Sequence, residues 1–290
     1  MARLVAVALA LLLAALAALL VARALGRARW RAGTATLRGR LAAARRPAPG
    51  ACFDAGALEG LPPPVARYFQ TVLRDGQPMI EVTHLRHTGT FDMGKATPAW
   101  KPFVSDQVVM ARPPGFDWDA TIAMAPGLDA LVHDAYVGGE GILHATVLGL
   151  VTVADVRGTP AAAEGELMRH LAEAAWSPTS LLPERGVRWT AIDEHSARAT
   201  LADGPTSVSL TFRFRDNGTI ESIRADARPR TVGAALVPTP WEGRFSSEAM
   251  RDGMRVPLGG EVGWITPEGY RPYWRGRIEE VTYQFAEVAP

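Results

Sequence analysis

Four polar side chains near the middle of the chain have the types and spacing that acid–base chemistry requires. They follow one another at intervals of three and four residues, which places them on one face of an α-helix. These residues are Glu166, Arg169, His170 and Glu173. Two carboxylates beside an imidazole could serve a hydrolase-like enzyme as general acid and base. In the alternative interpretation the face is solvated or interfacial, and Arg169 pairs with Glu173. The sequence favours this alternative, so no catalytic residue is assigned.

The histidines do not show the pattern of a metal site. His84 and His87 stand three residues apart in a segment predicted as a strand, where such residues point to opposite faces. His133, Asp134 and His144 lie on neighbouring strand patterns. They could meet across a sheet, as any polar residues there could. We therefore predict no metal ion.

The motifs of common cofactor enzymes are missing from the sequence. It contains no serine-centred nucleophile elbow, P-loop, dinucleotide-binding glycine motif or zinc-protease histidine motif. Cys52 is the sole cysteine, which excludes an internal disulfide framework and a thiolate metal cluster. It also lies well beyond the N-terminal apolar run, whereas a lipid-modified cysteine directly follows such a run. No cofactor is predicted.

The chain carries many large aromatic side chains, including eight tryptophans. Most such residues belong to the core of a protein, yet a curved sheet that carries many of them can enclose an apolar cavity. The candidates for lining such a cavity are Trp118, Tyr136, Trp189 and Phe212. Trp30 follows the apolar N-terminal run, and an amphipathic indole is favoured at a membrane interface.

Two amphipathic helices and many strands must position these residues. One helix begins at Pro62, carries an apolar stripe at intervals of three and four residues, and ends at Gly76. The second begins at Pro160 and ends before Ser177-Pro178. It contains the four polar residues described first, and it divides the predicted strands into two groups.

Outside the helices, apolar and polar residues alternate in the pattern of half-buried strands. Clear examples are residues 116–124, 207–214 and 281–285, and Asn217-Gly218 predicts a tight hairpin. No repeat or flexible linker separates the two groups of strands. We therefore expect one α+β domain with a large, curved antiparallel sheet, an open or half barrel, and a few helices.

The N-terminus carries an apolar run that is long enough to cross a membrane. Residues Leu4 to Ala22 are 19 apolar residues without a charge, and at about 1.5 Å per residue they just span a hydrocarbon core of about 30 Å. The alternative is a cleaved signal peptide with Ala22-Arg23-Ala24 as the cleavage site. The run is longer than the apolar region of roughly 7–15 residues in such peptides. A retained transmembrane helix is therefore favoured.

Basic residues are concentrated near this helix. Residues 1–50 contain nine arginines and no acidic residue, which leaves 22 basic and 30 acidic residues in the remainder. A globular part with a formal charge of −8 is a poor partner for nucleic acid, and none is predicted. We expect the stretch Arg23–Arg46 to lie along anionic headgroups, where each cation contributes about 1 kcal/mol to the free energy of membrane binding. The predicted organisation is an anchor (1–25), a basic juxtamembrane segment and linker (26–60), and one globular domain (61–290).

Several short motifs carry a resemblance to a known group of proteins. The segment Gly165–Trp176, followed by Pro178–Pro183 and Trp189, resembles the central signature of a family of uncharacterised bacterial proteins with an N-terminal membrane segment. Thr239–Gly243 and Pro272–Gly276 are similar to later motifs of the same family. The resemblance brings no known activity, so it implies no catalytic residues.

The resemblance extends from about Leu61 to the C-terminus. The order of helices and strands is also similar to lipoprotein-carrier and lipid-binding half-barrels of the periplasm, which implies an extracytoplasmic domain. The eight arginines after the apolar run instead predict a cytoplasmic domain by the positive-inside rule. The sequence therefore leaves open on which side of the membrane the globular domain lies.

The expected function is that of a membrane-tethered domain that binds a lipid or another apolar ligand in its curved sheet. Two alternatives remain: an interaction or scaffold module of the cell envelope, and, less favoured, a hydrolase-like enzyme. The expected partners are the membrane and an apolar small molecule. The sequence leaves the oligomeric state open.

Overall fold

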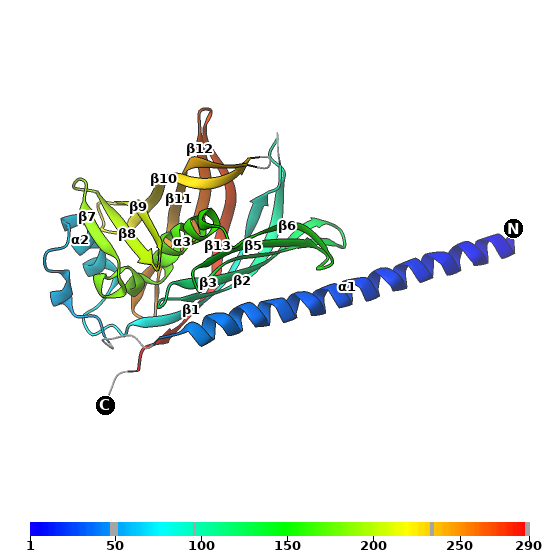
Figure 1. The fold of residues 1–290 in the computed structure, drawn as a ribbon, viewed down its shortest axis with the longest axis horizontal. Helices are drawn as coiled ribbons and strands as arrows, with labels where there is room; N and C mark the ends of the chain where they lie inside the picture. Colours follow the sequence, from blue (N-terminus) through cyan, green and yellow to red (C-terminus); the bar gives the residue numbers. More distant parts are fainter. Residues whose placement is uncertain (47–51, 95–96, 233–234, 288–290) are drawn as a thin grey trace.

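The computed structural model describes residues 1–46, 52–94, 97–232 and 235–287. Within them the chain forms a thirteen-stranded antiparallel sheet that curls around a helix (Figure 1). The α-helices are α1 (Ala2–Ala44), α2 (Pro63–Val72) and α3 (Pro160–Glu173), and short 3₁₀ helices span Ala55–Leu58, Ala174–Trp176, Pro178–Leu181 and Pro183–Arg185. The strands are β1 (Ile80–Asp92), β2 (Trp100–Met110), β3 (Gly115–Ala125), β4 (Leu128–Val137), β5 (Glu140–Val147), β6 (Val151–Arg157), β7 (Arg188–Ala191), β8 (Ser196–Asp203), β9 (Thr206–Phe214), β10 (Ile220–Val232), β11 (Ala235–Arg251), β12 (Met254–Thr266) and β13 (Gly269–Phe285). The predicted fold class, a curved half-barrel sheet with a few helices, is confirmed.

One long-range pairing makes a single sheet from the two groups of strands. The order across the sheet is β6-β5-β4-β3-β2-β1-β13-β12-β11-β10-β9-β8-β7. Strands that follow one another in the chain pair with each other, except β6 and β7, which form the two edges of the sheet. The two groups are joined where β1 pairs with β13, for example Leu85 with Val281. The predicted hairpin at Asn217-Gly218 joins β9 to β10.

The strand order also decides which turns share one end of the sheet. In an antiparallel meander, successive turns alternate between the two ends of the strands. From β6 across to β10, the ends at which five pairs of strands follow one another therefore lie on the same side of the sheet: β1 and β2, β3 and β4, β5 and β6, β12 and β13, and β10 and β11. We call this end the α1-side rim, because α1 contacts the β3–β4 and β5–β6 turns there.

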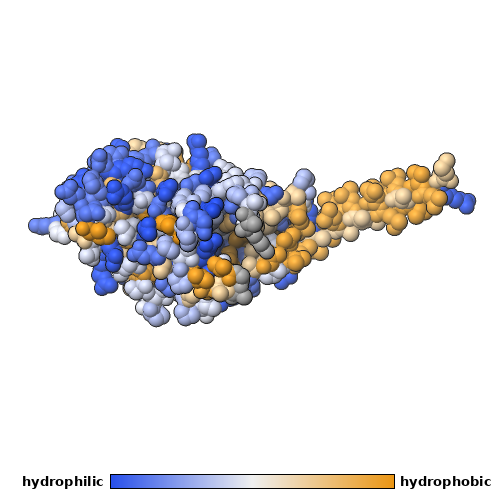
Figure 2. All heavy atoms as spheres, turned by 90° about the horizontal axis from the view of Figure 1, so that it is seen from above, coloured by the Kyte–Doolittle hydropathy of each residue, from blue (hydrophilic) through white to orange (hydrophobic). Residues whose placement is uncertain are grey.

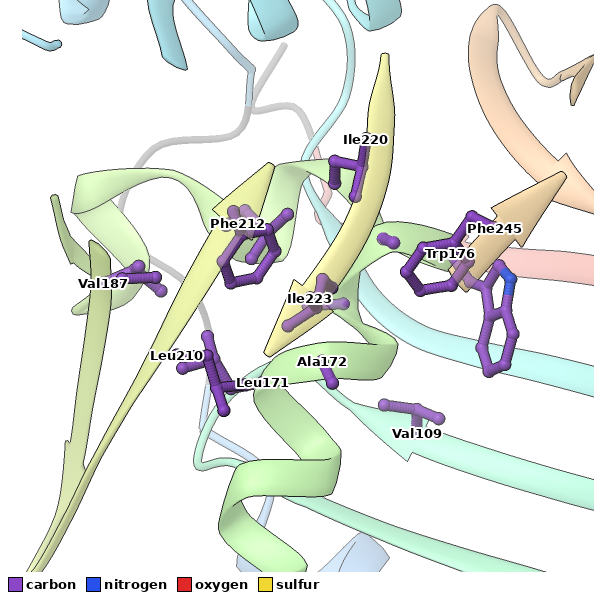
Figure 3. Packing of buried hydrophobic residues seen from close by; sticks show 14 of the residues in the cluster. Val109, Leu171, Ala172, Trp176, Val187, Leu210, Phe212, Ile220, Ile223 and Phe245 are labelled. Atoms are coloured by element: carbon purple, nitrogen blue, oxygen red, sulfur yellow. The ribbon is translucent and has the colours of Figure 1, made fainter. Parts of the chain in front are cut away.

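Helix α3 fills much of the concave side of the sheet. It contacts β3, β4 and β5 toward one edge and β9 and β10 toward the other. The Thr159 side chain caps its first turn by accepting a hydrogen bond from the Ala162 amide. Leu171 is 1% exposed, and Figure 3 shows it among buried residues of β9 and β10 that include Leu210 and Ile223. The helix therefore holds the two edges of the half-barrel together.

Helix α1 is continuous, but its two halves have different surroundings. The first half is apolar, exposed, and extends away from the globular part (Figures 1 and 2). The second half packs on the convex side of β3 and β4. Leu41 is 2% exposed and belongs to a small core cluster with Val82 and Met110. The helix thus leads from the apolar segment into the globular core without a linker.

Trp30, which was expected at a membrane interface, packs against the sheet. Its Nε1 donates a 2.8 Å hydrogen bond to Asp119 Oδ1, and its ring stacks on His133 with a centroid distance of 4.3 Å. Residues next to each other in a strand point to opposite faces. Asp119 and His133 therefore face α1, whereas their neighbours Trp118 and Asp134 face the concave side.

Most of the arginines that follow the apolar run, which were expected along anionic headgroups, have partners in the globular part. Five of the eight form ion pairs with carboxylates of the globular part. The pairs are Arg23 and Arg27 with Asp129, Arg38 with Asp106 and Asp117, Arg40 with Glu140, and Arg45 with Glu81. Because Asp117 is fully buried beside Arg38, this part of α1 belongs to the packed structure.

Candidate ligand-binding cavity

A cavity of about 930 Å³ lies between α3 and the concave side of the sheet. This volume is in the usual range of about 300–1,000 Å³ for ligand sites. A smaller recess of about 100 Å³ continues it inward. Phe91, Asp134, Arg228 and Tyr273 line both spaces. The lining combines apolar and aromatic side chains with a few buried charges, which suits a ligand with an apolar and a polar part.

Arg169 of α3 is the centre of a buried ion cluster at this recess. It is hydrogen-bonded to Asp134, and its Nε donates a 2.7 Å bond to Glu173 Oε1. Burial alone would lower its pKa, but the surrounding carboxylates outweigh that effect and raise the pKa of Arg169. Its guanidinium also lies 5.0 Å from the ring centroids of Phe116 and Trp118. Arg169 is thus a permanent cation that fixes α3 on β4.

Glu166 stands one turn earlier on α3 and has a different environment. Burial, and then the neighbouring Asp134 carboxylate, raises the pKa of Glu166 well above its usual range. Its Oε1 lies 3.5 Å from Arg228, and its Oε2 has no hydrogen-bond partner within the described residues. The ion pair between Glu166 and Arg228 is therefore long, and one Glu166 oxygen is left without a partner in the described structure.

Arg228 of β10 presents a cation and an aromatic frame to the cavity. Its guanidinium lies 5.1 Å from the centroid of Trp241 and 5.8 Å from that of Trp264. Its Nε donates to the Gly165 carbonyl at 3.2 Å, whereas its contact with the Tyr273 hydroxyl is 3.5 Å long. The Tyr273 hydroxyl also accepts a 3.0 Å bond from Trp241 Nε1, so its own hydrogen is free to donate. Arg228 and Tyr273 together can bind an anionic or strongly accepting group.

Sequence reasoning did not find Arg228, although two motifs of the family resemblance surround it. Trp241 belongs to the segment Thr239–Gly243, and Tyr273 belongs to Pro272–Gly276. Both were noticed as family motifs without a role. Their meeting at Arg228 follows from the pairing of β10 with β11 and of β12 with β13.

The four aromatic candidates for the cavity lining are placed differently from one another. Trp118 lines the inner recess and is 3% exposed. Tyr136 and Phe212 are fully buried in the packed core, and Trp189 packs on Phe212 with a centroid distance of 5.0 Å. The Tyr136 hydroxyl donates a 2.9 Å hydrogen bond to Asp203 Oδ2, which joins β4 to β8. These three side chains line neither the cavity nor its recess.

The polar face predicted on α3 exists, and the structure turns it toward the sheet. Glu166, Arg169 and Glu173 all line the cavity or its recess, and the Arg169–Glu173 hydrogen bond is present. Their side chains are only 12–15% exposed, so the face is not solvated. His170 is buried beside Phe116 and is directed away from the carboxylates. The imidazole and the carboxylates therefore do not form one acid–base unit.

Acidification should destabilise the protein through His170. Burial lowers the pKa of His170 to about 4, whereas an unfolded histidine titrates near 6.5. Between these values only the unfolded chain takes up the proton, so stability falls with falling pH by roughly 3 kcal/mol. Urea unfolding of the full chain in detergent at several pH values measures this slope. Burial also lowers the pKa of His87, to about 3, so that His87 contributes to the same slope. His170→Leu should therefore reduce the slope by about half, and His195→Leu, at an exposed histidine, should leave it unchanged. An unchanged slope in His170→Leu would contradict the assignment.

The histidines of β4 and β5 lie on the other side of the sheet. His133 and His144 face each other across the two strands, and Trp30 stacks over both. His133 Nδ1 is 2.7 Å from Asp117 Oδ1, while Asp134 faces α3. In the part of the chain that the structure describes, no three His, Cys, Asp or Glu residues are grouped in a way that could hold a metal ion.

The fold and the site define a half-barrel protein with an internal helix and an amphiphilic cavity. The chain belongs to the family of unknown function DUF6920, which it matches over residues 59–283. The resemblance to an uncharacterised family, expected from about Leu61 onward, is confirmed. No curated protein matches the chain.

Three crystal structures resemble the chain at low identity. A DUF1329 family protein from Desulfovibrio piger is 12% identical, with 80% of this chain and 94% of that chain covered and a TM-score of 0.39. A LolA superfamily protein from Nitrosomonas europaea is 10% identical, with 82% of this chain and 96% of that chain covered and a TM-score of 0.37. A β-barrel-like protein of domain of unknown function DUF1849 from Brucella abortus is 8% identical, with 73% of this chain and 99% of that chain covered and a TM-score of 0.31.

Proposed function

We propose that this protein is a membrane-anchored binding protein for an amphiphile with an acidic head group. The observation that carries the proposal is the cavity of about 930 Å³ with Arg228 at its inner end. The head group would accept hydrogen bonds from Arg228 and Tyr273. The apolar part would lie along Leu143, Val156 and Trp264, which line the outer part of the cavity.

The proposed anchor is the first half of α1. This segment is long and apolar enough to cross a membrane, and the rest of the protein buries none of its most apolar window. The helix continues through Ala22-Arg23-Ala24 without a break and packs on the sheet as far as Leu41. Signal cleavage there would leave only the packed half. The packing of the second half of α1 on the sheet supports a revised organisation, in which residues 26–44 belong to the globular domain.

Native mass spectrometry of the full chain, released from detergent micelles, tests whether a ligand is bound. We expect an adduct of lipid-like mass that is removed by organic extraction and restored by a total polar lipid extract. The full chain is needed because a fragment that starts at residue 48 would lose Leu41 from the core. A clean mass both before and after incubation with lipids would overturn the proposal and favour an interaction module.

Replacing Arg228 should weaken ligand binding. Arg228→Gln removes charge-assisted hydrogen bonds of about 1.5–3 kcal/mol, which corresponds to a roughly 10- to 150-fold lower affinity. Lipid titration followed by native mass spectrometry measures the change. Arg213→Gln is the matched control, since Arg213 is an exposed partner of Glu221 outside the cavity. Equal adduct populations in the two variants would place the head group elsewhere.

A further inference from the structure

Exposed apolar side chains of the globular part are concentrated at one end of the sheet. Among the described residues that follow α1, eleven large hydrophobic side chains are exposed. Eight of them lie in the turns or strand ends of the α1-side rim: Met93, Leu128, Leu150, Val151, Val153, Val232, Leu236 and Val237. Isolated exposed hydrophobic residues are common in proteins, but a grouped set marks an interaction surface.

The position of α1 relates this rim to the bilayer. Arg23 Nη1 donates a 2.8 Å hydrogen bond to the Gly127 carbonyl in the β3–β4 turn. Gly26 packs so closely on the β5–β6 turn that an added Cβ would lie 2.0 Å from the Leu148 oxygen. At about 1.5 Å per residue, Gly26 is only about 6 Å beyond Ala22, the last residue of the apolar run. With the first half of α1 spanning the bilayer as proposed, two turns of the rim would lie at the depth of the headgroup layer, which is about 5–8 Å thick on each side.

The exposed apolar residues continue from the β5–β6 turn along the start of the edge strand β6. Val151 and Val153 are 62% and 60% exposed on the edge strand β6, directly after the turn that contacts Gly26. In Figure 2 the hydrophobic surface of α1 extends onto the end of the globular part from which the helix emerges. The surface is thus continuous with the proposed membrane anchor.

The cavity opens at the same rim. Its lining includes Asp92 and Trp100 at the β1–β2 end, Thr266 at the β12–β13 end, and Arg230 and Leu236 at the β10–β11 end. The β1–β2 and β10–β11 ends also carry exposed apolar residues, among them Met93 and Val237. Aromatic and arginine side chains of this kind are favoured at membrane interfaces, and Arg275 stacks on Trp100 at 4.5 Å.

We propose that the α1-side rim docks on the bilayer that α1 spans, so that the cavity opens onto the lipid surface and exchanges its ligand there. This inference rests on the proposed function and names the source of the ligand: an amphiphile of the membrane itself. The occupant of the apolar rim is the lipid bilayer, because the rim adjoins the membrane helix.

Depth-dependent fluorescence quenching in vesicles tests the docking. Full-length protein with Cys52→Ser receives one cysteine at a time and an environment-sensitive fluorophore, and is reconstituted into vesicles of phosphatidylethanolamine and phosphatidylglycerol. Positions 151 and 236 probe the rim. Positions 192 and 250 are matched controls, because Ile192 and Met250 are equally apolar and exposed but lie away from the rim. The quenchers are a nitroxide attached to lipid headgroups and iodide in solution.

We expect the nitroxide to quench the fluorophore at 151 and 236 several-fold more strongly than at 192 and 250, and iodide to show the opposite order. Val151→Asp with Val153→Asp should restore iodide access at position 236. If the fluorophores at all four labelled positions were quenched to the same extent, the docking would be overturned. Shielding of the rim in native membranes but not in lipid vesicles would also overturn it, because a protein would then cover the rim.

The ligand measurement separates this inference from the proposed function. A lipid adduct in native mass spectrometry, together with a freely accessible rim, would reject only the docking. A docked rim without any adduct would reject the proposed ligand-binding function.

Discussion

Replacing Arg169 with leucine should lower the free energy of unfolding by about 3–5 kcal/mol, which is the usual cost of removing one partner from a buried ion pair. Arg169 is the cation that Asp134 and Glu173 share, and its side chain is 14% exposed. Without it, two carboxylates remain in a poorly hydrated recess, and α3 loses a direct connection to β4. Urea unfolding of the full chain in detergent, followed by tryptophan fluorescence, measures the change.

Two controls make this experiment specific for the charge cluster. Adding Asp134→Asn and Glu173→Gln to Arg169→Leu removes the unpaired charges and should restore much of the lost stability. Arg213→Leu breaks an exposed ion pair with Glu221 and should cost only about 0–1 kcal/mol. Similar losses for Arg169→Leu and Arg213→Leu would show that the cluster does not stabilise the fold.

Filling the cavity at Gly165 should abolish ligand binding while the fold is retained. Gly165 is buried on α3 and lines the cavity, yet a Cβ added to it meets no atom within 4 Å. A tryptophan there would occupy the space in front of Arg228, whose Nε bonds to the Gly165 carbonyl. Losing the head-group contact and part of the apolar wall should weaken the binding free energy of the ligand by about 3 kcal/mol or more. This change corresponds to a roughly 100-fold lower affinity. Native mass spectrometry should show Gly165→Trp without the lipid adduct.

The matched control is Gly39→Trp, because Gly39 is also a helical glycine with open space around its added Cβ, but it lies in α1. Removing glycine from a helix favours folding at both positions, so both variants should unfold at concentrations of urea no lower than the wild type does. An adduct that persists in Gly165→Trp would mean that the ligand does not enter this cavity.

The face of α1 that packs on the sheet shows where hydrophobic patterning failed as a guide. Arg23, Arg27, Trp30, Arg38 and Leu41 recur at intervals close to helical spacing, and all of them contact the globular part. The stripe was hidden because most of its members are arginines, which patterning methods assign to solvent or headgroups. Their partners are carboxylates on distant strands.

Local sequence signals were sufficient for most elements of the fold. The helix expected from Pro62 is α2, the helix expected from Pro160 is α3, and Asn217-Gly218 forms the expected hairpin turn. The apolar run at the N-terminus forms the first half of α1. These features depend on the conformational preferences of neighbouring residues and on the period of the apolar pattern, both of which act over a few residues.

The cavity depends on tertiary structure, because its parts are distant in the chain and its key residues are polar. Asp134, Glu166 and Arg228 come from β4, α3 and β10, and they meet only because the pairing of β1 with β13 makes one sheet that curls around α3. Alternation along a strand shows which residues share a face, but it does not show which strands lie opposite each other. The sequence by itself therefore determined the helices, hairpins and apolar segment, and the long-range strand pairing decided which buried charges and aromatic rings surround one cavity.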